Sequence, residues 1–186
     1  MVEPLNRDTL SRICDGDHRA IRFFETLTDA VNGLSGVSQS APASGAAATF
    51  TNLPPGLSEI RVMFDGLAIS GAGNILIQLG TAAGFEAAGY ASTSAFSNGA
   101  SVGQVADDTG FVVWLGGGSL QGEMTLSRFR PGEESWVASH VVRRSATQAA
   151  FGAGGAKTLA APATQLRVTP TGGLTLTGGR VSLLYR

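Results

Sequence analysis

Residues 59–90, EIRVMFDGLAISGAGNILIQLGTAAGFEAAGY, contain the pattern on which the fold of this chain depends. Apolar residues occupy every second position on both sides of a glycine-rich centre, namely Ile60, Val62 and Phe64 before it and Ile75, Ile77 and Leu79 after it. Successive side chains of a strand point to opposite faces, so a period of two predicts two half-buried strands. Gly71 and Gly73 lie in the short turn between them. The stretch therefore predicts two antiparallel strands joined as a hairpin.

The rest of residues 48–186 repeats this alternation of short apolar segments and turn residues. Further strands are expected at residues 48–53, 90–96, 111–115, 120–130, 135–144, 157–161, 165–169, 173–176 and 181–185. Residues 97–109 are expected to form a loop, and residues 149–155 a loop or a weak strand. About ten short strands with turns every ~8–12 residues are typical of all-β domains. We expect a mainly β fold, an antiparallel sandwich that is jelly-roll-like, preceded by one N-terminal amphipathic helix.

Residues 1–34 differ in kind from the rest of the chain. Asp17 comes after a turn signal and is well placed as an N-cap. Apolar residues then recur at spacings of four and three, which is the period of a helix. These positions form one face and are Ala20, Phe24, Leu27, Val31 and Leu34. Gly33 is well placed to end the helix.

The segment after this helix bears on what the helix does. Residues 35–47, SGVSQSAPASGAA, are small and polar, and this composition is typical of a flexible linker. One alternative is that the helix packs on its own β-domain, and the other is that it docks elsewhere or self-associates. A linker of this length favours the second alternative. The sequence thus divides into an anchoring segment (1–34), a linker (35–47) and a β-sandwich domain (48–186).

Composition excludes several classes of protein. The 186 residues are 43% hydrophobic with a net charge of −1, which suffices for a core and suggests attraction to neither nucleic acid nor an anionic membrane. No apolar run approaches the ~20 residues that a membrane-spanning helix needs, so no membrane insertion is expected. The N-terminus has no apolar segment of the kind found in secretory signals. Cys14 is the only cysteine, so no internal disulfide forms.

The motifs of common enzymes and cofactor sites are absent or incomplete. Residues 151–158, FGAGGAKT, approach a phosphate-binding loop, but Phe151 and Ala156 stand where glycine is required and no helix is expected after them. The two histidines, His18 and His140, lie outside any nucleophile motif, and His140 is expected in the middle of a strand.

Two pairs of acids, Asp107-Asp108 and Glu133-Glu134, fall in expected turns, where solvated charge is more typical than glycosidase catalysis or calcium binding. We expect no catalytic residue, no metal and no cofactor, and we expect that the chain is not an enzyme.

Four aromatic residues, Tyr90, Phe96, Trp114 and Trp136, are available to stack on sugar rings or to fill the core. The apolar neighbours of Trp114 favour the core. Trp136 comes after an acidic turn at the start of a strand, where exposure and burial are about equally expected. Trp136 and Tyr90 are therefore the candidate contacts for a glycan.

Two motifs at the ends of the β-region resemble a β-rich domain of tail-fibre, head-fibre and other virion proteins of tailed bacteriophages. The first is residues 60–80, IRVMFDGLAISGAGNILIQLG, with the later pair Gly89-Tyr90. The second is residues 165–186, QLRVTPTGGLTLTGGRVSLLYR, which has Leu176-Thr177 where the domain usually has Phe-Asp. Residues 15–31, DGDHRAIRFFETLTDAV, also look like the short helical segments with which many phage structural proteins dock on the particle.

These resemblances imply a virion structural protein, either a tail or head fibre component or a capsid decoration component. They imply a homo-oligomer, expected to be a homotrimer, that contacts other virion proteins through residues 1–34. The alternative is a module that binds a host glycan or receptor for attachment. Neither resemblance brings catalytic residues to this chain.

Overall fold

The computed structural model describes residues 37–97, 101–130, 132–145 and 150–186, together with Asp17, Arg19, Ala20, Phe23 and Phe24. The chain divides into two compact units, which are residues 1–37 with Arg186 and residues 38–185. The second unit is the β-domain.

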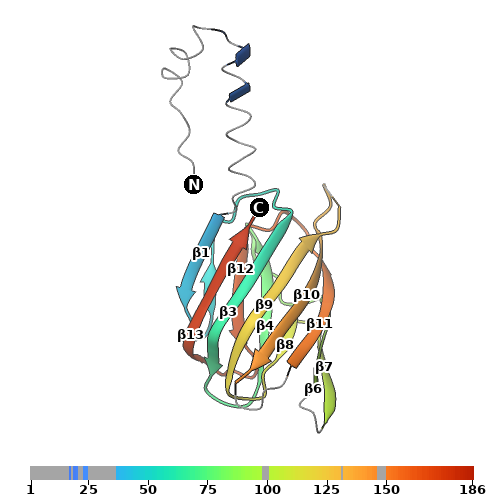
Figure 1. Ribbon diagram of the computed structural model, residues 1–186. Coiled ribbons are helices and arrows are strands. Elements are labelled where there is room, and N and C mark those ends of the chain that lie inside the picture. Colours follow the sequence, from blue (N-terminus) through green and yellow to red (C-terminus); the bar gives the residue numbers. More distant parts are fainter. Residues whose placement is uncertain are drawn as a thin grey trace. The chain divides into compact units, whose positions relative to one another are not determined.

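Two antiparallel sheets make up the β-domain (Figure 1). The eight-stranded sheet has the order β1 (Val37–Pro42), β13 (Leu176–Tyr185), β3 (Glu59–Ile69), β9 (Ser119–Arg128), β10 (Ser135–Arg144), β11 (Ala150–Thr158), β6 (Ala91–Ser97), β7 (Val102–Asp107). The five-stranded sheet has the order β2 (Ala48–Phe50), β12 (Gln165–Pro170), β4 (Asn74–Thr81), β5 (Gly84–Phe85), and β8 (Phe111–Trp114) also pairs with β4. The expected mainly β sandwich is confirmed.

The strands expected within residues 59–80 are present as β3 and β4, but they do not form a hairpin. β3 belongs to the eight-stranded sheet and β4 to the five-stranded sheet, so residues 70–73 carry the chain from one layer to the other. The closing strands do the same, because β12 pairs with β4 and β13 pairs with β3. Alternation and a glycine turn predict two strands, but they do not say whether the strands pair or face each other across a core.

The linker expected at residues 35–47 is wrong for residues 37–42, which form the edge strand β1. The amide of Gln39 donates to the Tyr185 hydroxyl at 3.0 Å, and the backbone N–H of Ala43 donates to the Gly179 carbonyl at 3.0 Å. Small polar residues are compatible with an edge strand, since pairing uses the backbone and only one side of the strand is covered. The β-domain therefore begins at β1 and not at Ala48.

Two more segments differ from expectation. Residues 97–109, expected as a loop, contain β7, and β11 joins the segments expected at 149–155 and 157–161 into one strand. The strands expected at residues 120–130 and 135–144 are present as β9 and β10, which form an antiparallel hairpin with Trp136 opposite Arg128. β13 also replaces two expected short strands and has register shifts near Gly178.

The core lies between the inward faces of the two sheets. Its members alternate with outward residues along strands such as β3, β10 and β12, whereas β4 and β8 are buried at consecutive positions. Ile60, Ile77 and Leu183 have no exposed surface. Burying each such side chain contributes about 1.5–3 kcal/mol, so the facing pair of sheets is the main source of stability.

Five residues of the expected N-terminal helix are described. Arg19, Ala20, Phe23 and Phe24 have helical backbone, and the Asp17 carboxylate accepts the backbone N–H groups of Arg19 at 2.8 Å and Ala20 at 3.4 Å. Leu27, Val31 and Leu34 lie outside the described residues. Five positions do not define an element, so the helix stays a prediction. Among the described residues no helix is long and apolar enough to span a membrane.

Candidate functional site

The two aromatic residues expected to contact a glycan are buried in the core. Trp136 is 1% exposed and Tyr90 is 4% exposed. Neither ring is available to stack on a sugar, which corrects the sequence-based assignment. The cause lies in β10, where apolar residues occur on both faces: Trp136 points inward, while Val137 and Val141 point outward and are 40% and 74% exposed. The alternation alone did not decide which face was covered.

The Tyr90 hydroxyl holds the loop after β4. It accepts the backbone N–H of Leu79 at 2.9 Å and donates to the carbonyl of Glu86 at 3.1 Å. The ring packs edge-on against Phe111, with centroids 5.0 Å apart. Burial raises the pKa of Tyr90 to about 12, so the phenol stays neutral and acts as a structural hydrogen-bonding group.

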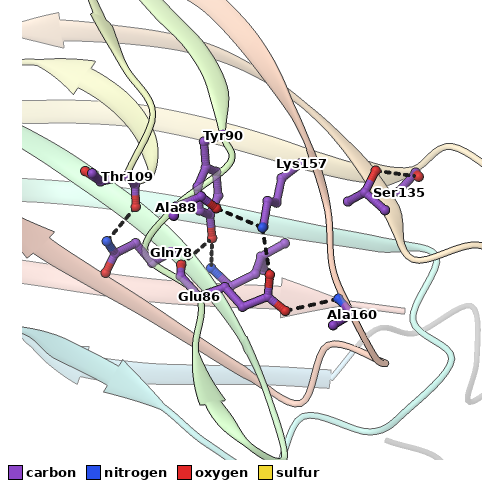
Figure 2. A network of polar contacts seen from close by, with 10 residues as sticks. Gln78, Glu86, Ala88, Tyr90, Thr109, Ser135, Lys157 and Ala160 are labelled. Atoms are coloured by element: carbon purple, nitrogen blue, oxygen red, sulfur yellow. Dashed lines mark hydrogen bonds and ion pairs between the residues drawn. The ribbon is translucent and has the colours of Figure 1, made fainter.

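Lys157, the only lysine of the chain, is buried in a polar network beside this tyrosine (Figure 2). Its Nζ lies 2.7 Å from Glu86 Oε2, donates to the Ala88 carbonyl at 2.9 Å, and lies 5.1 Å from the centroid of the Tyr90 ring. The other carboxylate oxygen of Glu86 accepts the N–H of Ala160 at 3.1 Å.

Burial by itself raises the pKa of Glu86, but the hydrogen bond and charge of Lys157 and the Ala160 N–H outweigh it, and the pKa is lowered. This ion pair clamps β11 to the loop after β5. In the sequence, Lys157 is marked only as part of the incomplete phosphate-loop motif at residues 151–158. The feature of the sequence that indicates burial is that Lys157 lies an even number of positions from the inward-facing residues of β11.

His140 and Ser94 form a buried pair between β10 and β6. Ser94 Oγ lies 3.1 Å from His140 Nε2 and also accepts the N–H of Trp114 at 3.1 Å. Burial lowers the pKa of His140 to about 4, so the imidazole is neutral near pH 7. A nucleophilic serine must reach its substrate, whereas Ser94 has no exposed surface. A serine beside a histidine is the residue pair of a nucleophile and its base, but this pair is buried and acts as a contact within the core.

The serines of β6 have a structural task. Ser92 Oγ accepts the N–H of Val112 at 2.8 Å, as Ser94 Oγ does for Trp114. These two amides lie on β8 and would otherwise face the eight-stranded sheet without a partner. Polar side chains therefore occupy inward positions of β6, because buried backbone N–H groups require acceptors.

The acidic pairs make local contacts. Asp107 accepts both the N–H and the hydroxyl of Thr109. Glu133 lies 3.4 Å from Arg130, and Glu134 lies 3.5 Å from Arg128. No three His, Cys, Asp or Glu side chains of the described part of the chain gather as a metal site would require.

A half-buried aromatic stack lies at the end of the domain where β8 leads into a glycine loop. The rings of Phe96 and Trp114 stack with centroids 4.0 Å apart and planes 11° apart. The Arg144 guanidinium lies 4.8 Å from the Trp114 centroid and donates to the Leu115 carbonyl at 3.0 Å. The stack packs against the core, as the apolar neighbours of Trp114 predict.

The outer surface of the eight-stranded sheet has two unlike halves. On β3 and β9 it is charged, with Arg61 and Glu123 paired at 2.6 Å. On β10, β11, β6 and β7 it carries mostly small uncharged residues, with the exposed Arg143 near the end of β10; we call the uncharged positions the neutral face. They are Ser135, Val137, Ser139, Val141, Gly152, Gly154, Ala156, Thr158, Ala91, Thr93, Ala95, Ser97, Val102, Gln104 and Ala106.

The free margin of the neutral face is β7, where Val102 is 82% exposed. At the other end of β6 and β7 lies a depression of about 620 Å³, lined by residues 90–93 and 106–108. The neutral face and its β7 margin expose three apolar side chains, those of Val102, Val137 and Val141, among small uncharged residues. This margin was missed because the sequence predicted a loop at residues 97–109, where the structure has β7.

Comparison with known proteins gives no family. No protein-family model and no curated protein matches the chain. Solved structures with low similarity to the chain include the following three. Galectin-Ib of Xenopus laevis has a TM-score of 0.32 and 13% identity over 74% of this chain and 99% of its own. CG-16, a homodimeric agglutinin from chicken liver, has a TM-score of 0.32 and 11% identity over 73% and 98%. Scytalido-glutamic peptidase has a TM-score of 0.31 and 11% identity over 76% and 73%. Likeness this weak says nothing of function.

Proposed function

We propose that this chain is a structural protein of a tailed-bacteriophage virion, a fibre or decoration component that displays its β-domain in several copies. Residues 1–34 form the helical anchor that docks on other virion proteins, with Ala20, Phe24, Leu27, Val31 and Leu34 on the contacting face. The β-domain has a binding or structural role and no catalytic one.

One observation carries this proposal. The two motifs that resemble the virion domain lie at opposite ends of the β-region in sequence, yet they form one unit in space. Residues 60–80 supply β3 and β4, residues 165–186 supply β12 and β13, and each strand of one motif pairs with a strand of the other. Their turns are joined as well, because the N–H of Thr171 donates to the Asn74 carbonyl at 2.9 Å. Two separate motifs that build one central unit support the resemblance better than either motif alone.

The entry of the chain into the domain also supports display. β1 begins beside Tyr185, at the end of the sandwich where β3 begins and β9 ends. The turn between β3 and β4 and the glycine loop after β8 lie at the opposite end (Figure 1). β1, the first strand of the β-domain, therefore begins at one end of the sandwich, and the two glycine turns lie at the other end. Many identical copies bind by avidity even where each contact is weak.

The alternative, a module that binds a host glycan or receptor, loses the two residues that suggested it. Tyr90 and Trp136 are buried. A receptor site on this domain would have to use other residues, such as those of the neutral face. The two roles are compatible, since one displayed domain is able to combine a structural task with a binding task.

The experiment that tests the proposal measures incorporation into the particle. Particles from the virus that encodes the chain are purified with three versions of the gene: full length, without residues 1–34, and with Phe24→Ala and Leu27→Ala on the apolar face of the expected helix. The protein is quantified by mass spectrometry of the purified particles. We expect full incorporation of the first and loss of the other two.

The matched control is Arg22→Ala with Glu25→Ala, on the polar face of the same expected helix, which should incorporate normally. Incorporation of the truncated protein at the normal level would exclude the anchor. Absence of the full-length protein from every particle would exclude the virion role itself.

A further inference from the structure

β7 is an unprotected edge of the eight-stranded sheet. In the described part of the chain it pairs with β6 alone, so one row of its backbone N–H and C=O groups faces outward. Residues 102–106, VGQVA, contain no charge and no proline, and Val102 is 82% exposed. Native sheets usually prevent edge-to-edge association by charge, proline, short strands or cover.

The other edges have such protection. β2 has three residues and β5 has two. The outer amides of β8 are satisfied by the serines of β6. β1 also carries no charge, and its one protecting residue is Pro42 at its end, which has no N–H to donate. β7 has neither a charge within residues 102–106 nor a proline, and this makes it the less protected margin of the eight-stranded sheet.

We propose that β7 pairs with β7 of a second copy of this chain, antiparallel and about a two-fold axis, so that the two eight-stranded sheets become one. The inference rests on the proposed virion role for one point alone, namely that several copies are close together. A two-fold contact is isologous, so the same strand serves on both sides. It links copies in pairs, which differs from the homotrimer that the sequence resemblance implies.

The register is set by the side chains. Opposite residues in an antiparallel pair lie on the same face of the sheet, so Val102, Gln104 and Ala106, which face outward, must oppose one another. Centring the axis on Gln104 places Val102 against Ala106 and Gln104 against Gln104. On the inner face Gly103 then opposes Val105.

Charge selects this register over its neighbours. Moving the centre to Val105 places Asp108 against the exposed Val102, and moving it to Gly103 leaves only residues 102–104 of the strand paired. Centring on Gln104 pairs the five uncharged residues and leaves Asp107 beyond them. The two glutamine amides at the axis are also able to hydrogen-bond to each other, as each has a donor and an acceptor.

Cysteine crosslinking tests the register directly. In the full chain with Cys14→Ser, the variant Gln104→Cys places two thiols opposite each other on the axis. Opposite Cα atoms of an antiparallel pair lie about 4.5–5.5 Å apart, within the range that a disulfide spans. Mild oxidation should convert most of the protein into a dimer that runs as such on a non-reducing gel and returns to monomer with dithiothreitol.

Two matched comparisons make the result specific. Gln121→Cys places a thiol at an exposed glutamine of β9, away from the edge, and should crosslink at least tenfold more slowly. Val102→Cys alone should crosslink poorly, whereas a mixture of Val102→Cys and Ala106→Cys should form the mixed dimer. Circular dichroism checks that each variant keeps the β fold.

A charge swap supplies an independent measurement. Gln104→Lys or Gln104→Glu alone places like charges on the axis and should weaken association at least tenfold by sedimentation velocity, and mixing the two variants should restore it. The inference would be overturned if Gln104→Cys formed crosslinked dimers no faster than Gln121→Cys. It would also be overturned if the protein without substitutions stayed monomeric at every concentration in sedimentation velocity. Either result leaves the incorporation test of the virion role unaffected.

Discussion

Replacing Lys157 by methionine tests whether the buried ion pair stabilises the β-domain. The change removes the ammonium group but keeps most of the apolar stem, and it leaves the Glu86 carboxylate with the Ala160 N–H. Removing one partner of a fully buried pair costs about 3–5 kcal/mol. The Lys157 side chain is 7% exposed and that of Glu86 is 25% exposed, so water reaches the carboxylate and we expect roughly 2–3 kcal/mol.

Urea unfolding monitored by circular dichroism measures this loss. For a domain of this size ~2–3 kcal/mol corresponds to a fall in Tm of about 5–10 °C. Glu86→Gln and the double variant complete a thermodynamic cycle, in which the coupling free energy should be about 1–3 kcal/mol. Arg61→Met, which breaks the exposed pair with Glu123, is the control and should change stability little. A Lys157→Met loss below about 0.5 kcal/mol, or strict additivity in the cycle, would refute the reasoning.

The same pair predicts a dependence on pH. The pKa of Glu86 is lower in the folded chain than its ordinary value of 4.5, so the folded state binds the proton less readily. The pair therefore contributes stability above pH 4.5, and this contribution is lost as pH falls through the folded pKa. Unfolding at pH 7 and at pH 3.5 should show a smaller acid loss for Glu86→Gln than for the unchanged protein. Equal acid losses would contradict the clamp.

Three other predictions concern buried or constrained positions. Trp136→Ala should destabilise the domain by about 3–5 kcal/mol in urea unfolding, since the side chain fills the core; unchanged stability would contradict its burial. Gly179→Ala should destabilise by more than about 1 kcal/mol, because its φ is +87° and a Cβ would overlap the backbone of Asp65 and Gly66 in β3. Gly178→Ala has open space and should be near neutral. Burial lowers the pKa of His140 from 6.5 to about 4, so the neutral imidazole contributes stability above pH 6.5, and up to roughly 3 kcal/mol of it is lost as the pH falls toward 4. The variant His140→Gln should flatten this dependence of stability on pH. An NMR titration of His140 with a midpoint near 6.5 would contradict the prediction.

The sequence predicted most strands of the β-domain but not how they are connected. Period-two patterning located β3, β4, β9 and β10 to within a few residues, because each has one face on the core. The pairing of β3 with β4 was wrong, since a turn of a few residues serves equally for a hairpin and for a step between layers. β1 and β7 fall in the expected linker and loop, because an edge strand of small polar residues lacks the alternation that marks a covered strand.

The candidate site was harder to predict than the fold. The local sequence pattern does not decide which face of the strand carries Trp136. The register of β10 places the Trp136 ring in the core, and the contacts of Tyr90 place its ring there. The neutral face combines two pairs of consecutive strands, β6 with β7 and β10 with β11, and the two pairs are far apart in the chain, so no short motif marks it. The Lys157 network likewise joins residues far apart in sequence, such as Glu86 and Ala160. Long-range pairing, absent from local patterns, decided each of these outcomes.

The number of copies per particle tests the central claim most directly. Particles of the phage proposed to encode the chain are purified and digested, and peptides of the β-domain are quantified by mass spectrometry against isotope-labelled standards and against the major capsid protein. The proposed virion role predicts a fixed number of copies, constant between preparations and in simple ratio to the symmetry of the head or tail. A trace amount that varies between preparations, or peptides found only in the soluble fraction of the lysate, would contradict it.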